Sequence, residues 1–295
     1  MEDLVQIEGL AKRYDGFALQ DIALTVPAGT VVGLIGSNGA GKTTTLKILL
    51  GMLEPDGGTV RLLGRDPLGR DIDALKQQVG VVLDTCSFPV TMTVGDAGAL
   101  GRVAYDRWDQ RRFADLCAAF GLEQRKGTKA LSRGMGMKLS LAFALAHHPQ
   151  LLVLDEATAG LDPLARDEVL DLLRQYMEDG GRGILISTHI TSDLEKIADE
   201  VACIDDGRLV FDLPKDAICD TAGVARCRTA DLQAIAASGF MAPEDMLTLA
   251  HPYGTDLLVP DRFAFARAFP AIALDRASIE DYMALMLKGR KGGLR

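Results

Sequence analysis

The stretch Gly36-Ser37-Asn38-Gly39-Ala40-Gly41-Lys42-Thr43 decides the fold. Glycines at this spacing let backbone N–H groups curl around phosphate oxygens at the start of a helix, where the helix dipole favours anions. We expect Lys42 to reach the β- and γ-phosphates of a nucleotide and Thr43 to bind Mg²⁺. The competing interpretation is a plain glycine turn, which the flanking sequence disfavours.

The flanking sequence predicts a strand before this loop and a helix after it. Residues 31–35 form a continuous apolar run, which is typical of a buried parallel strand. After the loop, Leu46, Leu49 and Leu50 fall at helical spacing. Two further buried runs, 151–154 and 184–187, alternate with helical stretches. The chain is therefore predicted to form a layered α/β domain around a mostly parallel sheet.

Titratable side chains follow the two later strands. Asp155 and Glu156 come directly after the first, where one carboxylate would hold Mg²⁺ and the other would polarise an attacking water. His189 ends the second, where a neutral imidazole would sense the γ-phosphate. A solvated acid pair and a structural histidine are the plainer alternatives, and the phosphate loop favours the catalytic roles. His147 and His148 are expected to be structural, as cations at a helix C-terminus.

The composition is that of an ordinary globular protein. The 295 residues are 48% hydrophobic and 25% charged, with a formal net charge of −9. Because acids and bases are interspersed, no basic stripe is available for a nucleic-acid backbone, and nucleic-acid binding is disfavoured. We expect neither a signal peptide nor a membrane helix, since no run reaches ~18 apolar residues. The five scattered cysteines are expected to be reduced core thiols.

Other patterns predict the remaining organisation of the core. Residues 4–8 and 22–26 alternate apolar and polar and predict an antiparallel β flap. Residues 94–146 have a helical pattern throughout and predict a helical subdomain inserted in the α/β core. Two short apolar runs joined by Asp205-Asp206-Gly207-Arg208 predict a closing hairpin.

The chain is expected to contain two domains. The first would span residues 1–212, and a small accessory domain would span residues 213–295. The accessory stretch is Ala-rich and weakly patterned until Ser278, which is predicted to cap a helix. One face of that helix would carry Ile279, Tyr282, Met283 and Met286.

Two more motifs complete the pattern. Leu131-Ser132-Arg133-Gly134-Met135 precedes the Asp155-Glu156 strand, and Gly160-Leu161-Asp162 follows it. In this order, over residues 2–211, the motifs strongly resemble the ATP-binding cassette of ABC transporters. The resemblance implies an α/β fold: a P-loop NTPase core with an N-terminal antiparallel β subdomain, an inserted helical subdomain and a small C-terminal α+β appendix.

The resemblance also implies roles for individual residues. Tyr14 would stack on the adenine ring of ATP, although an ordinary half-buried aromatic is the plainer alternative. Ser132 and Gly134 would complete the site of an opposing subunit, and Asp162 would lie in a loop that communicates across that interface. The implied catalytic residues are Lys42, Glu156 and His189, and the implied Mg²⁺ ligands are Thr43, Asp84 and Asp155. The implied nucleotide-binding residues are Tyr14, Gly36, Ser37, Asn38, Gly39, Ala40, Gly41, Lys42, Thr43, Thr44, Ser132, Gly134 and Asp162.

The sequence departs from the family pattern at two places. Arg133 and Met135 replace the third and fifth residues of Leu-Ser-Gly-Gly-Gln, and Asp84 stands where glutamine is usual. A carboxylate can still bind Mg²⁺ but, when ionised, cannot donate a hydrogen bond. The combination is similar to a bacterial exporter branch whose ATPases are encoded apart from a six-helix permease.

We therefore expect an ATPase subunit that pairs with a second copy on binding ATP and powers a separate permease from the inner face of the cell membrane. A soluble ABC-type ATPase acting on nucleic acid or the ribosome is the alternative, disfavoured because heptads and a second phosphate loop are absent. A subunit that binds ATP without hydrolysing it is disfavoured by Glu156 and His189. Residues 86–94, with Phe88, Pro89 and Met92 exposed, are a candidate docking surface for a permease loop, or an ordinary loop.

Overall fold

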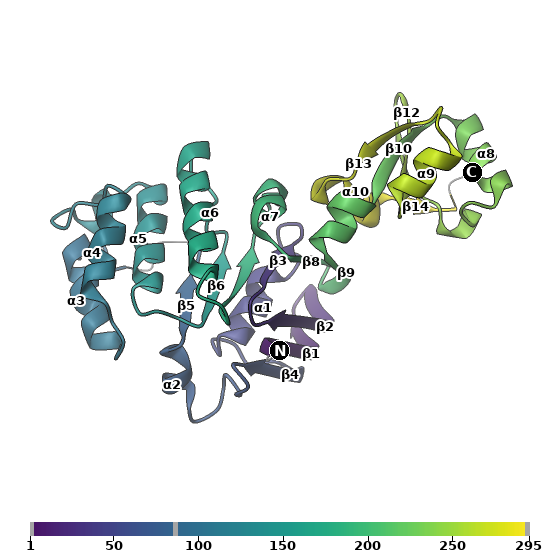
Figure 1. Cartoon of the computed structure of the whole chain (residues 1–295). Helices are drawn as coiled ribbons and strands as arrows, with labels where there is room; N and C mark the ends of the chain where they lie inside the picture. Colours follow the sequence, from purple (N-terminus) through teal and green to yellow (C-terminus); the bar gives the residue numbers. More distant parts are fainter. Residues whose placement is uncertain (1–2, 85–87, 293–295) are drawn as a thin grey trace. The chain divides into compact units, whose positions relative to one another are not determined.

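The computed structural model describes residues 3–84 and 88–292, and its chain divides into two compact units (Figure 1). The first unit contains Met1–Ile190 and Ile204–Leu209, and the second contains Thr191–Cys203 and Val210–Arg295. The chain passes between the units after Ile190, within β8 (Glu200–Asp205) and within β9 (Arg208–Pro214), and the turn that joins these strands belongs to the first unit.

Two sets of strands build the first unit. An antiparallel sheet has the order β2-β1-β4, from β1 (Asp3–Tyr14), β2 (Phe17–Pro27) and β4 (Gly57–Leu62). Four parallel strands have the order β5-β6-β7-β3, from β3 (Val31–Ile35), β5 (Val79–Val82), β6 (Leu151–Asp155) and β7 (Gly183–Ser187). Every residue of β3, β6 and β7 is buried, as expected of parallel strands covered on both faces. The predicted flap and parallel sheet are confirmed.

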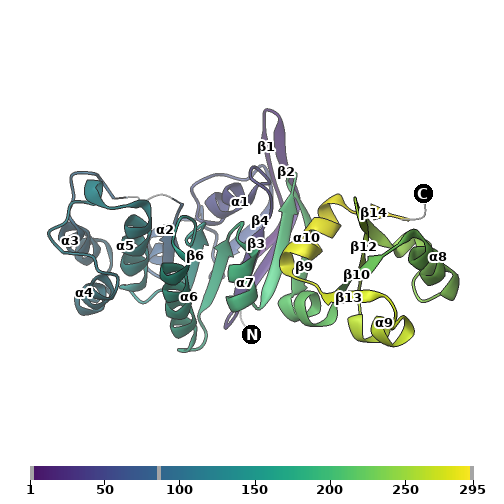
Figure 2. The ribbon, with the colours of Figure 1, turned by 90° about the horizontal axis from the view of Figure 1, so that it is seen from above.

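Helices complete the first unit. Three of them are α1 (Lys42–Leu49), α2 (Ile72–Lys76) and α6 (Pro163–Met177). Three more, α3 (Val94–Ala104), α4 (Gln110–Ala119) and α5 (Arg133–Leu145), lie together at one end of the unit, with a 3-10 turn at Thr128–Ala130 (Figure 2). Their shared core contains fully buried Phe113 and Leu139. All three fall within residues 94–146, the stretch predicted to be helical.

Part of the segment expected to dock a permease loop is packed rather than exposed. Phe88 is half-buried and meets Phe143 of α5 edge-on, with ring centroids 5.2 Å apart. Pro89 is exposed as expected, and its carbonyl accepts a hydrogen bond from Thr128 Oγ1 at 2.7 Å. The expectation that Phe88 is exposed is therefore wrong, because its ring packs against the aromatic core of α3, α4 and α5. Cys86 lies outside the described residues.

The second unit is an α+β structure around an antiparallel sheet. Its strand order is β13-β10-β12-β11-β14, from β10 (Gly223–Cys227), β11 (Leu247–His251), β12 (Gly254–Val259), β13 (Ala273–Arg276) and β14 (Arg290–Lys291). Its helices are α7 (Thr191–Ile197), α8 (Thr229–Ser238), α9 (Arg262–Ala268) and α10 (Ile279–Lys288), with short turns at Ala217–Thr221 and Pro243–Asp245. Separate apolar clusters contain Leu257 and Leu258, consecutive residues of β12, so both faces of the sheet are covered. The predicted cap at Ser278 is confirmed, with Asp281 as its partner.

His147 is neutral rather than cationic. Its side chain is fully buried, and its ring stacks on Tyr105 with centroids 3.9 Å apart and the planes 9° from parallel. Burial lowers the pKa of His147 from 6.5 to about 4, so the expected helix-end cation is wrong at this position. His148 has Nε2 3.5 Å from Asp109 Oδ2 at the surface.

This buried imidazole should make stability depend on pH. Because the pKa of His147 is lower in the folded protein than in the unfolded chain, the unfolded state binds the extra proton. The contribution is complete above pH 6.5 and is lost as the pH falls toward about 4, a loss of about 2–3 kcal/mol. The variant His147→Phe keeps an aromatic ring against Tyr105 but cannot bind this proton. Its free energy of unfolding, measured with denaturant across this pH range, should not show that loss. Parallel stability curves for the two proteins would contradict this assignment.

Candidate nucleotide site

The phosphate loop joins buried strand β3 to helix α1. Lys42 begins α1 and is only 6% exposed. Its ammonium donates hydrogen bonds to the carbonyls of Gly36 at 2.8 Å and Ser37 at 3.2 Å. The ammonium of Lys42 is therefore bonded to the first two residues of the phosphate loop, and its charge lies at the N-terminus of the helix.

Thr43 and Asp155 meet although they are far apart in sequence. Thr43 Oγ1 donates to Asp155 Oδ2 at 2.9 Å. Asp155 is buried, and its Oδ1 has no hydrogen-bond partner among the described residues. An unpaired buried carboxylate oxygen is unfavourable without a cation or a water on it. A carboxylate and a hydroxyl are oxygen ligands of the kind that suit a hard divalent cation, so these two residues fit a metal site.

Glu156 and His189 form a second pair at the same edge of the sheet. Strands β6 and β7 are parallel neighbours, with Asp155 opposite Ser187, so the residues after them emerge side by side. The backbone N–H of Glu156 donates to Ser187 O at 2.8 Å. His189 Nδ1 lies 2.6 Å from Glu156 Oε2, a hydrogen bond in which the ring N–H donates to the carboxylate. Such a pair can hold a water and accept its proton.

Lys42, Thr43 and Glu156 line one cleft of about 530 Å³. Asp155 and His189 are not in its lining but are hydrogen-bonded to Thr43 and Glu156. Tyr14 contributes a ring that is 46% exposed, beside Phe17 at a centroid distance of 6.5 Å. Phe17 was not predicted, although the β1–β2 hairpin pairs it directly with Tyr14. The cleft is lined by Tyr14, Phe17, Asn38, Gly39, Ala40, Gly41, Lys42, Thr43, Thr44, Asp84 and Glu156.

Three predicted residues lie elsewhere in the first unit. Ser132 caps α5, accepting a hydrogen bond from Met135 N at 3.2 Å. Asp162 caps α6 in the same way, through Ala165 N at 3.0 Å. Neither they nor Gly134 line the cleft of their own chain.

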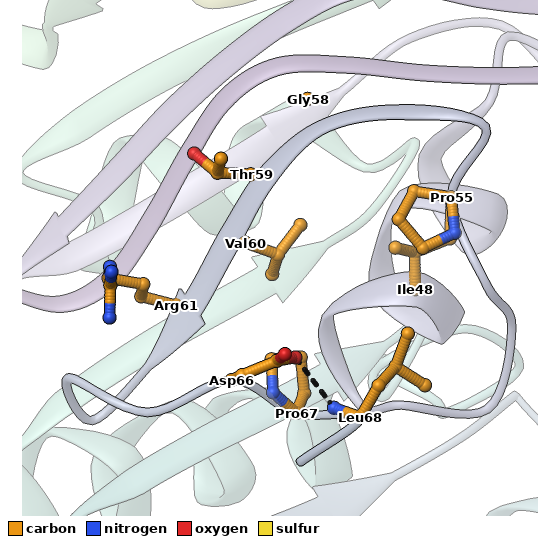
Figure 3. Close-up of a pocket in the computed structure, with 9 residues that line it drawn as sticks. All are labelled: Ile48, Pro55, Gly58, Thr59, Val60, Arg61, Asp66, Pro67 and Leu68. Carbon is orange, nitrogen blue, oxygen red and sulfur yellow. Dashed lines mark hydrogen bonds between the residues drawn. The ribbon is translucent and has the colours of Figure 1, made fainter.

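Two other hollows in the first unit differ chemically from this cleft. One, of about 250 Å³, lies between α1 and β4; in it Asp66 Oδ1 accepts from Leu68 N at 2.9 Å (Figure 3). It is lined by Ile48, Pro55, Gly58, Thr59, Val60, Arg61, Asp66, Pro67 and Leu68, and no predicted site residue is among them. The other is a largely apolar groove of about 320 Å³, lined by Leu50, Met52, Leu62, Ile72, Leu75, Lys76, Val79, Val81, Leu83 and Tyr105. Neither contains a carboxylate–imidazole pair.

Comparison with known proteins identifies the family. Residues 19–159 match the sequence profile of the family described as "ABC transporter". The chain is 36% identical over 212 residues to the daunorubicin/doxorubicin resistance ATP-binding protein DrrA of Streptomyces peucetius. This match covers 70% of this chain and 64% of DrrA. It is 35% identical over 213 residues to the bacitracin transport ATP-binding protein BcrA of Enterococcus faecalis. This second match covers 71% of this chain and 69% of BcrA. The chain belongs to the ABC transporter family.

A solved structure described as the ATP binding subunit of an ABC transporter has the same fold. It is 29% identical, with a TM-score of 0.68, and the match covers 74% of this chain and 92% of that chain. The first unit is therefore an ABC ATPase domain, and the predicted fold class is confirmed. The match with DrrA spans less than two thirds of that relative's length. Within residues 3–84 and 88–292, no helix combines the length and apolarity needed to span a bilayer.

Proposed function

We propose that this chain is the ATP-hydrolysing subunit of an ABC exporter, working as a pair of identical subunits on a separately encoded membrane permease. The observation that carries the proposal is the 2.6 Å contact between Glu156 and His189 beside the phosphate loop. A subunit that only binds ATP needs no carboxylate held against an imidazole there. The names of DrrA and BcrA, which refer to drug resistance and bacitracin transport, support the exporter role.

The proposed chemistry assigns one task to each side chain. Lys42 holds the β- and γ-phosphates with its ammonium. Glu156 orients a water and accepts its proton as the water oxygen bonds to the γ-phosphorus. The bond from that phosphorus to the β,γ-bridging oxygen breaks, and ADP and phosphate leave. His189, bonded to one carboxylate oxygen of Glu156, keeps the other directed toward the water.

Mg²⁺ is the metal that we propose for Thr43, Asp155 and Asp84. The buried, unpaired Oδ1 of Asp155 and the Thr43 hydroxyl support this assignment, and Asp84 lines the same cleft. Mg²⁺ is commonly bound by one or two carboxylates together with phosphate oxygens and water. When bound, it would neutralise charge that develops on the transferred phosphoryl group.

A second copy of the chain is the proposed partner at the cleft. Ser132 and Gly134, at the start of α5, would contact the phosphates held by the phosphate loop of the opposing copy. Their absence from the lining of their own cleft supports this arrangement. Asp162, which caps α6, would stand at the same interface.

The permease is the proposed occupant of the apolar groove. Leu83 lines the groove and the next residue, Asp84, lines the nucleotide cleft, so one peptide bond joins the two sites. An apolar cytoplasmic segment of the permease would bury this groove, and its movement would reach the cleft through Asp84. The subunit would then be held at the inner face of the membrane by its partner.

A charge in the groove should detach the permease without affecting ATP binding. Met52 is 55% exposed in the groove wall, so Met52→Glu should fold, but it would bury an unpaired carboxylate in the complex. We expect recovery of the permease with the tagged chain from detergent-solubilised membranes to fall by about tenfold or more. The measurement is mass spectrometry of the copurified membrane proteins.

The matched control is Val103→Glu, which adds the same charge at a position that is 87% exposed on α3. The proposal requires a partner with six apolar spans that is retained by this control and lost with Met52→Glu. Equal recovery from both variants would exclude the groove as the docking site.

A further inference from the structure

The end of β8 and the turn that follows it are hydrogen-bonded to the phosphate loop at two points. Asp205 Oδ1 accepts a hydrogen bond from Ser37 Oγ at 2.9 Å. Gly207 N donates to the carbonyl of Ala40 at 3.0 Å. These two bonds lie on either side of Asn38 and Gly39, which line the nucleotide cleft.

The turn between β8 and β9 is closely packed against strand β2. Asp206 and Gly207 both have positive φ, 43° and 71°, as in the tight hairpin turns that Asp-Gly favours. A Cβ on Gly207 would lie 1.8 Å from Ala18 O, and the carbonyl of Gly207 accepts a hydrogen bond from Gln20 N at 2.7 Å. Strand β2 therefore fixes the turn against the phosphate loop.

The first residue of the loop packs against the same hairpin. A Cβ on Gly36 would lie 2.1 Å from Ile204 O, so the backbone of the loop and the end of β8 are in direct contact. Asp205, the next residue, brings its carboxylate to Ser37. The loop is thus supported by packing at Gly36 and by hydrogen bonds at Ser37 and Ala40.

If only charge mattered, a carboxylate at the position of Asp205 would be unfavourable for ATP binding. A carboxylate next to a loop that binds a triphosphate repels the ligand and lowers affinity. The hydrogen bond to Ser37 acts in the opposite direction, because a loop ordered in advance loses less conformational freedom when the phosphates bind. The second effect gives a physical reason for an acid at this position.

We infer that Asp205 is a positioning residue for ATP, acting through Ser37 on the backbone N–H groups of the phosphate loop. The inference rests on the proposed function, since it takes ATP as the ligand of this loop. Asp205 itself does not touch the reacting atoms. Its effect should therefore fall on the KM for ATP and spare kcat.

Steady-state ATPase measurements on the full chain test this inference. Asp205→Ala should raise the KM for ATP about fivefold with little change in kcat. Asp205→Asn keeps an oxygen for the Ser37 hydroxyl and removes the repelling charge, so its KM should equal that of the wild type or fall below it. Ser37→Ala should raise KM as Asp205→Ala does, and the double variant should be no worse than either single one.

Asp206→Asn is the control, because it removes a neighbouring exposed charge without a hydrogen bond to the loop. It should leave KM nearly unchanged. A wild-type KM in Asp205→Ala, or an equal defect in Asp205→Asn and Asp205→Ala, would overturn the inference while the activity of the wild-type chain still supported the proposed function. A wild-type chain without ATPase activity would instead count against the function itself.

Discussion

Replacing Glu156 with glutamine should stop ATP turnover and leave ATP binding intact. Glutamine has nearly the same size and can still accept a hydrogen bond from His189, but it lacks the negative charge that draws a proton from water. We expect kcat for phosphate release to fall about 10²–10⁴-fold. ATP affinity, measured by calorimetry on the same variant, should match that of the wild type.

The same variant should accumulate as an ATP-bound pair. If the pair opens only after hydrolysis, blocking the chemical step leaves it closed, and light scattering in the presence of ATP should report twice the mass of one chain. Glu178→Gln makes the same chemical change at an exposed helix end and serves as the control. Full turnover in Glu156→Gln would remove Glu156 from its proposed role.

The parts of the site that the sequence predicts are those whose signals are local. The phosphate loop is a continuous motif, and Asp155, Glu156 and His189 each follow a short apolar strand. Once the strands are taken as parallel, their carboxyl ends meet at one edge, which is enough to expect these side chains together. The hydrogen bonds Thr43–Asp155 and Glu156–His189 agree with that expectation.

The parts that could not be predicted depend on pairings between distant segments. Asp205 lies in a sequence typical of any hairpin turn, and only the folded chain brings it to Ser37, 168 residues earlier. In the second unit, β10 lies between β12 and β13, so its neighbours come from later in the chain and leave no local pattern. The prediction that His147 is a cation was wrong for a similar reason, since the burial of its ring depends on contacts such as that with Tyr105.

Replacing Lys42 with alanine should weaken ATP binding about 100-fold, because a charge-assisted contact to the phosphates is lost from a buried position. The measurement is the Kd for ATP, obtained by calorimetry or by a fluorescent analogue. Lys47→Ala, in the last turn of the same helix, removes the same charge away from the loop and should bind ATP normally. Wild-type affinity in Lys42→Ala would contradict the assignment of the phosphate loop.

Lys42 would act on ATP in two ways, and ADP distinguishes them. Its ammonium bonds to the carbonyls of Gly36 and Ser37, so alanine also removes an internal support of the loop. Loss of that support alone would weaken ADP and ATP equally, because both nucleotides use the loop N–H groups. Loss of a contact to the γ-phosphate would weaken ATP more than ADP, since ADP lacks that group. We expect the larger loss for ATP, which would assign the main role of Lys42 to the phosphates and a smaller one to the order of the loop.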